Sequence, residues 1–132
     1  MIEEQFVSLD TAKLLKEAGF DAPCYIQYSD IGIQWDNAPY PENFNADDWG
    51  YSCPTQALAA RWLREVHRIV VDATFIPPSV NGDVWQYFVG EMDDMVWKGD
   101  YEPSDCKYAT YEQAMEAGLQ EAIKSIKKKE AV

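Results

Sequence analysis

The pattern of apolar and polar positions predicts a helix close to the start of the chain. Ala12, Leu15 and Ala18 recur at helical spacing, so we expect this helix to begin at Ser8 or Asp10 and to end at Ala18. The next two residues are suited to a left-handed cap that ends a helix sharply.

Gly19 can adopt the left-handed conformation of that cap, and Phe20 would then pack back on Leu15. Residues 24–35 are rich in aromatic and β-branched types and alternate in polarity towards their end. This composition predicts one or two strands.

A second amphipathic helix is predicted at residues 54–67, with Pro54 in its first turn. Five apolar residues fall on one side of this helix: Leu58, Ala59, Trp62, Leu63 and Val66. Three arginines fall on the other side: Arg61, Arg64 and Arg68. Because the two faces differ so clearly, we expect the apolar one to lie against a core.

The second half of the chain predicts a β-hairpin and a long final helix. Strands are expected at residues 69–76 and 84–92, joined by a turn at Asn81-Gly82, with a short third strand at 95–97. The helix is expected to begin at Thr110, where Gln113 completes a capping-box spacing. Its apolar stripe consists of Tyr111, Met115, Leu119, Ala122, Ile123 and Ile126, with Gly118 inside it.

These elements predict a single α+β domain over residues 1–132. We expect an antiparallel sheet of about three to five strands packed against helices, in the order helix, strands, helix, hairpin, third strand, helix. The chain contains 47% hydrophobic and 14% aromatic residues, which is ample for one core.

The charge of the chain limits its partners. Its 23 acidic and 11 basic residues give a net charge of −12, which disfavours binding to nucleic acid or to an anionic membrane surface. The sequence has no long apolar run, its first residues do not resemble an export signal, and Cys24, Cys53 and Cys106 suit reduced thiols. We therefore expect a cytoplasmic protein.

Two regions are candidates for an interaction surface. The loop at residues 36–52 carries Tyr40, Phe44 and Trp49, and is expected either to pack down on the domain, the favoured interpretation, or to bind a partner. The arginine face of the central helix is expected either to pair with acidic loops, again the favoured interpretation, or to bind a carboxylate or phosphate of a partner. The candidate residues are Arg61, Arg64, Arg68, Tyr40, Phe44 and Trp49.

The sequence indicates no catalytic, cofactor-binding or metal-binding residue. Cys53 lies at the start of the central helix, but His67 lies about 21 Å away at its other end, so the two cannot form a catalytic pair. The adjacent pairs Asp47-Asp48 and Asp93-Asp94 could hold a divalent cation, although no ligand-spacing motif accompanies them.

Three phrases of the chain carry a resemblance to known proteins. They are SLDTAKLLKEAGFDAPC near the start, CPTQALAARWLREVH in the middle and YEQAMEAGLQEAIK at the end. Together they resemble a group of small proteins, without an established activity, that prophages and other mobile elements of gut Bacteroidetes encode. The resemblance implies an accessory protein of phage or mobile-element origin and assigns no site residues.

The function expected from these observations is that of a non-enzymatic, acidic accessory protein that binds another protein; self-association is also compatible with the sequence. One alternative is a mimic of DNA that inhibits a DNA-binding protein. Another is a small metal-dependent enzyme that uses Asp47 and Asp48, or Asp93 and Asp94.

Overall fold

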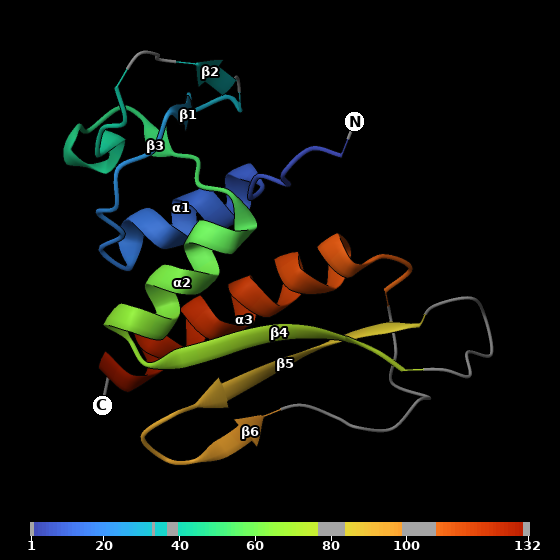
Figure 1. The fold of residues 1–132 in the computed structure, drawn as a ribbon. Coiled ribbons are helices and arrows are strands. Elements are labelled where there is room, and N and C mark those ends of the chain that lie inside the picture. The colour runs from blue at the N-terminus through green and yellow to red at the C-terminus, as the bar shows by residue number, and fades with distance from the viewer. Residues whose placement is uncertain (1, 33, 37–39, 77–83, 99–107, 131–132) are drawn as a thin grey trace.

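The protein is an α+β protein, as predicted, and its strands form two separate sheets (Figure 1). The computed structural model describes residues 2–32, 34–36, 40–76, 84–98 and 108–130. The elements in chain order are α1 (Leu9–Glu17), β1 (Ile26–Tyr28), β2 (Gln34–Asp36), the 3-10 helix η1 (Phe44–Ala46), β3 (Tyr51–Ser52), α2 (Gln56–Val66), β4 (Ile69–Phe75), β5 (Trp85–Glu91), β6 (Val96–Lys98) and α3 (Tyr111–Glu130).

Helix α1 begins and ends as its sequence predicts. The Ser8 side chain accepts a hydrogen bond from the backbone N–H of Thr11, and so caps the N-terminus of the helix. At the other end Gly19 has a φ of 89°, and the Phe20 N–H donates to the carbonyl of Leu15 over 3.0 Å. This arrangement is the predicted left-handed cap.

Helix α2 differs from the prediction at both ends. It is capped by Thr55, whose side chain accepts from the Leu58 N–H over 3.1 Å, so Pro54 precedes the helix instead of lying in its first turn. Val66 was predicted to face the core, but it is 59% exposed because the helix ends there. Arg68, with a φ of 56°, then turns the chain into β4.

The larger sheet has the order β4-β5-β6 and is antiparallel throughout. Its first two strands pair along seven residues, from Ile69 opposite Glu91 to Phe75 opposite Trp85. The predicted hairpin strands and the short third strand are thereby confirmed, while the predicted turn at Asn81-Gly82 lies outside the described residues. The smaller sheet, also antiparallel, has the order β2-β1-β3.

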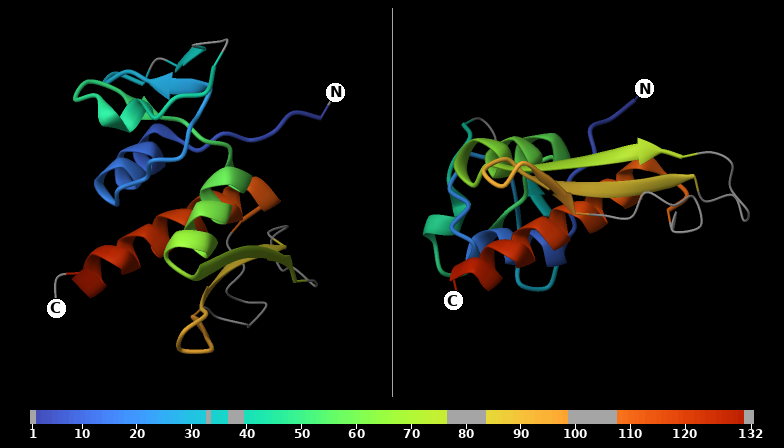
Figure 2. Two further views of the ribbon diagram at one scale, coloured as in Figure 1. Left: turned by 60° about the vertical axis from the view of Figure 1, so that its left-hand side comes forward. Right: turned by 90° about the horizontal axis from the view of Figure 1, so that it is seen from below.

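The helices lie between the two sheets (Figures 1 and 2). Helices α2 and α3 pack on β4, α3 also packs on β5, and α1 contacts both α3 and β3. One buried cluster draws on all three of these helices and on both sheets; its members include Leu15, Phe20, Tyr28, Trp62, Leu63, Val71, Leu119 and Ile123. Trp62 lies at the centre of α2 and contacts the ring of Phe20 edge-on, with centroids 5.2 Å apart.

Helix α3 approaches the larger sheet closely at Gly118. A Cβ atom at this position would lie 2.8 Å from Cγ1 of Val71 and 2.9 Å from Cβ of Tyr87. Thr110 caps the helix by accepting from the Gln113 N–H, as predicted, while the Gln113 side chain accepts from the N–H of Ala109. The predicted apolar stripe is buried except at Tyr111, which is exposed at the first turn.

Candidate functional site

Residues 17–60, which we call the acidic segment, contain no lysine, arginine or histidine. The segment forms the smaller sheet, η1 and the first half of α2. Its acidic residues are Glu17, Asp21, Asp30, Asp36, Glu42, Asp47 and Asp48. Within it Tyr40 is 71% exposed and Trp49 is 51% exposed, and Tyr25 is exposed as well. Large aromatic side chains are therefore presented to solvent among carboxylates.

The described part of the loop at 36–52 is packed on the domain, in agreement with the favoured interpretation. The Asn45 side chain donates to the Phe20 carbonyl and accepts from the Ser52 N–H, each over 2.9 Å. The Ser52 hydroxyl in turn accepts from the Phe44 N–H over 3.0 Å. Phe44 is only 4% exposed, so its place among the candidate interaction residues was wrong: it fills the core beneath the loop.

Helix α1 fastens this loop through one lysine. The ammonium group of Lys16 donates to the carbonyls of Asp47 and Gly50 over 2.6 and 2.7 Å, and lies 5.1 Å from the centre of the Tyr51 ring. These contacts fix the backbone on both sides of Trp49. The exposed indole is thus held on a defined support, which reduces the conformational entropy that binding would cost.

Two of the three arginines form ion pairs within the chain. Arg61 pairs with Glu65 over 3.0 Å, one helical turn away, and Arg68 pairs with Asp93 over 2.5 Å. Among the residues that the structure describes, no carboxylate lies within ion-pair distance of Arg64. Two of the three arginines are therefore paired internally, but the favoured interpretation, pairing with acidic loops, holds only for Arg68, because Arg61 pairs within α2.

Arg64 lines a groove between α2, α3 and β4, with a volume of about 460 Å³. Helix α2 contributes the small side chains of Ala57 and Ala60, and α3 contributes the larger side chains of Tyr111 and Met115. Glu3, Glu4, Gln5, Thr55, Gln56, Val71 and Glu112 complete the lining. Arg64 is the only basic residue of this lining.

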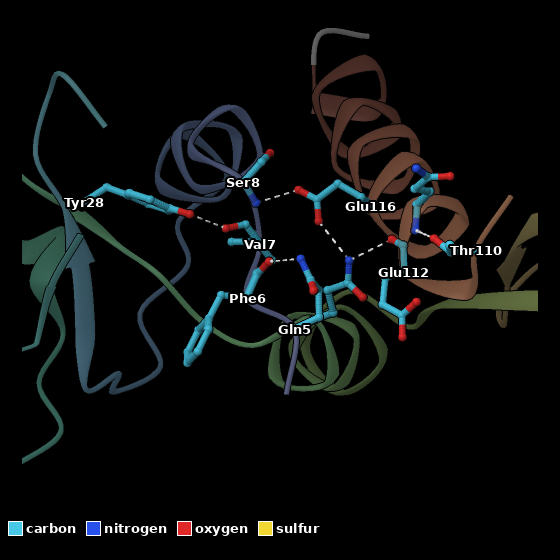
Figure 3. Close-up of a pocket in the computed structure, with 10 residues that line it drawn as sticks. Gln5, Phe6, Val7, Ser8, Tyr28, Thr110, Glu112 and Glu116 are labelled. Carbon is cyan, nitrogen blue, oxygen red and sulfur yellow. Dashed lines mark hydrogen bonds between the residues drawn. The ribbon is translucent and has the colours of Figure 1, made fainter. Parts of the chain in front are cut away.

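A second cavity, of about 450 Å³, lies where the N-terminal segment crosses the first turns of α2 and α3 (Figure 3). Glu116 points into this region from α3. Its carboxylate accepts from the Ser8 N–H over 2.7 Å, from the Thr11 hydroxyl over 2.6 Å and from the Gln56 side chain over 3.0 Å. The carboxylate thereby joins α3 to the starts of α1 and α2, where the helix dipoles favour a negative charge.

The Glu116 network was not foreseen from the sequence. A carboxylate that directly follows Met115 and lies three residues before Leu119 borders the apolar stripe of α3, and that position was the one available signal. Its donors are 60 or more residues away in the chain. The donors are a backbone N–H and two polar side chains at the starts of α1 and α2, and no sequence pattern links them to Glu116. Only the packed structure identifies them.

Cys24 and Cys53 are free, buried thiols. Burial raises the pKa of Cys24 from 9.0 to about 12, and the pKa of Cys53 is also raised, chiefly by burial. The Cys53 thiol donates towards the Val7 carbonyl at 3.8 Å and precedes the first turn of α2 by three residues. Burial thus outweighs any activation by the helix dipole, and Cys106 lies outside the described residues.

We expect both thiols to be unreactive in the folded protein. In a Cys106→Ser background, a disulfide reagent at pH 8 should modify them about 100-fold more slowly than in urea, because thiolate forms only after opening. Since their folded pKa values lie above 9, they stabilise the fold below about pH 9, and this contribution is lost as the pH rises towards 12. In a Cys24→Ala variant, the free energy of unfolding should fall less as the pH rises from 9 towards 12. Rapid modification of the folded protein would contradict this account.

In the acidic pairs considered for metal binding, one carboxylate and one backbone carbonyl have basic partners. Asp93 is engaged by Arg68, and the Asp47 carbonyl accepts the Lys16 ammonium. Within the described residues, no group of three or more His, Cys, Asp or Glu side chains is placed to hold a metal ion.

The fold and its surfaces define a small α+β protein; in the part of the chain that the structure describes, three α-helices lie between two three-stranded antiparallel sheets. None of the helices in the described part of the chain is long and apolar enough to cross a membrane. No protein-family model, no curated protein and no solved structure matches the chain.

Proposed function

We propose that this protein is a non-enzymatic accessory protein that binds another protein through its acidic segment. The observation that carries the proposal is the exposure of Tyr40 and Trp49 in a stretch with seven carboxylates and no basic residue. Aromatic side chains supply much of the energy of protein interfaces, and carboxylates select the charge of the partner. The partner is accordingly a protein with a basic surface.

The support beneath the exposed aromatics strengthens this proposal. Trp49 lies between the two carbonyls that Lys16 holds, so its backbone is fixed before a partner arrives. The cytoplasmic location and the origin in phages or mobile elements stay predictions. Both are compatible with a small acidic protein that acts by occupying another protein.

The contribution of the aromatics is tested by a paired substitution. Trp49→Ser together with Tyr40→Ser should weaken the complex with a partner captured from the producing cells by at least about 100-fold, because interface aromatics contribute about 2 kcal/mol or more when central. Calorimetry with the purified partner gives the affinity. A matched control is Met95→Asn, which alters an 88% exposed side chain in the turn before β6. Asparagine readily adopts the positive φ of 54° found at this position, so the control should not strain the backbone.

Equal affinities for the double variant and the control would reject the acidic segment as the interface. Failure to capture any specific partner would count against the proposed function as a whole. Binding should also weaken steeply with added salt if the carboxylates contribute.

A mimic of DNA is a specific form of the same proposal, favoured by the run of carboxylates without a basic residue. Its partner would be a DNA-binding protein, and duplex DNA would compete with this chain for it. A partner that binds both at once would exclude the mimic while leaving protein binding intact.

A further inference from the structure

Strand β4 lies at an edge of the larger sheet, and its pairing with β5 determines which backbone groups point outward. The Ile76 N–H donates to the Val84 carbonyl and the Met92 N–H donates to the Arg68 carbonyl. In an antiparallel pair such bonded positions alternate along the strand, so the even-numbered residues of β4 face β5. The N–H and C=O groups of the odd-numbered residues, from Ile69 to Phe75, therefore point away from the sheet.

Within the described ranges, this outer edge has no backbone partner. Among the residues that the structure describes, no main-chain hydrogen bond beyond those to β5 involves Val71, Ala73 or Phe75. One bond to the outer edge comes from within the strand: the Asp72 carboxylate accepts from the Ala73 N–H over 2.9 Å. A free edge with outward donors and acceptors is a template for another extended chain.

The groove of about 460 Å³ lies directly beside this edge. Val71 of β4 forms one border, Ala57 and Ala60 keep the α2 side low, and Tyr111 and Met115 of α3 supply apolar surface. In Figure 1 α2 lies on the side of β4 that is opposite β5. The first turn of α3 contacts β5, where the rings of Tyr111 and Trp85 have centroids 5.5 Å apart. Alternate side chains of an added strand would thus have a place to pack, as strand addition requires.

The charges around the groove indicate which kind of extended segment would bind beside β4. Glu3, Glu4 and Glu112 line the groove, against the single base Arg64, and the exposed Asp72 stands on the edge itself. In a two-fold pairing of two copies centred on β4, Asp72 would face Asp72 of the other copy, and like charges directly opposite destabilise a sheet. The net charge of −12 adds a long-range repulsion between copies.

We propose that the outer edge of β4 binds an extended, positively charged segment of a partner protein, which adds to the sheet as a further strand. A basic side chain of that segment would draw the Asp72 carboxylate away from the Ala73 N–H and free this donor for the partner's carbonyl. The groove shares Thr55, Gln56, Ala57 and Ala60 with the acidic segment but does not include Tyr40 or Trp49, and the proposal does not depend on the function proposed above.

The test uses a capped eight-residue peptide that alternates lysine and valine, added to the chain of residues 1–132 labelled with ¹⁵N. Amide hydrogen exchange of the outward N–H groups of Val71, Ala73 and Phe75 should slow by at least about tenfold on binding, because these groups become bonded. The inward N–H groups of Val70, Asp72 and Thr74 are bonded already and should change little. A peptide with glutamate in place of lysine should not bind.

Two variants make the test specific. Asp72→Lys should weaken peptide binding by at least about tenfold, whereas Asp10→Lys, the same change of charge at an exposed site on α1, should have a small effect. Phe75→Pro removes one outward donor and leaves the inward bonds in place, so it should weaken binding in a protein whose folding is verified by circular dichroism.

Three results would overturn the proposal. The first is the absence of binding at millimolar peptide. The second is binding that leaves exchange of the outward amides unchanged or that responds equally to Asp72→Lys and Asp10→Lys, since either shows only general charge attraction. The third is protection of the outward amides in the protein alone that increases with its concentration, which would show that a second copy occupies the edge.

Discussion

Replacement of Glu116 by alanine is expected to lower the free energy of unfolding by about 3 kcal/mol, since hydrogen bonds to a charged group contribute about 1.5 to 3 kcal/mol each. The carboxylate accepts from Ser8, Thr11 and Gln56, and its loss leaves these donors without their shared acceptor. Water can reach the adjoining cavity and will replace part of the loss. Urea unfolding followed by circular dichroism measures the change.

Two further substitutions define the origin of that effect. Glu116→Gln keeps one acceptor oxygen and should cost less, about 1 kcal/mol. Glu121→Ala removes an exposed carboxylate five residues later on α3 and should change stability by no more than about 0.5 kcal/mol. If Glu116→Ala were as mild as Glu121→Ala, the network would not connect the three helices energetically.

Gly118 is the second position with a large expected effect. Gly118→Val should lower the free energy of unfolding by about 3 kcal/mol, since overpacking of a filled core costs about 1 to 3 kcal/mol and valine adds three carbon atoms. Its Cβ alone would lie 2.8 Å from Val71 and 2.9 Å from Tyr87, which forces α3 away from the sheet. Thermal or urea unfolding gives the measurement.

The alanine variant separates packing from helix propensity. In an exposed helix Gly→Ala stabilises by about 1 kcal/mol, whereas here we expect a net loss of about 1 kcal/mol because the new methyl group has no room. Adding Val71→Ala to Gly118→Ala should recover part of the loss, since it removes the nearest atom. A gain in stability for Gly118→Ala alone would show that the helix and sheet are not in contact at this point.

The features that the sequence predicted correctly are local ones. The cap formed by Gly19 and Phe20 depends on residues within one turn of each other, and so does the start of α3 at Thr110. The strands of the larger sheet followed from their composition and alternation. The caps depend on contacts within a few residues, and the strands depend on the alternation of apolar and polar positions. Both are visible in the sequence itself.

The errors arose where position in the packed molecule decides. Val66 and Phe44 are both large apolar residues, yet the first is exposed where α2 ends and the second is buried by hydrogen bonds that close the loop over it. One predicted sheet became two because α2 and its neighbours separate the strands that precede α2 from those that follow it. The periodicity of a helix or strand predicts which of its faces is apolar, but it does not predict which other segment packs on that face.

The sequence by itself determined the helices, the caps of α1 and the N-terminal cap of α3, the main strands, the α+β class and the strong negative charge of this protein. Only the tertiary structure decided that Glu116 joins three helices and that Arg61 and Arg68 are paired while Arg64 lines a groove. It also decided that no described segment pairs with the outer edge of β4. The physical reason is one of range. Backbone propensity and side-chain periodicity act over a few residues, whereas these partners are brought together only when segments distant in the chain pack into one core.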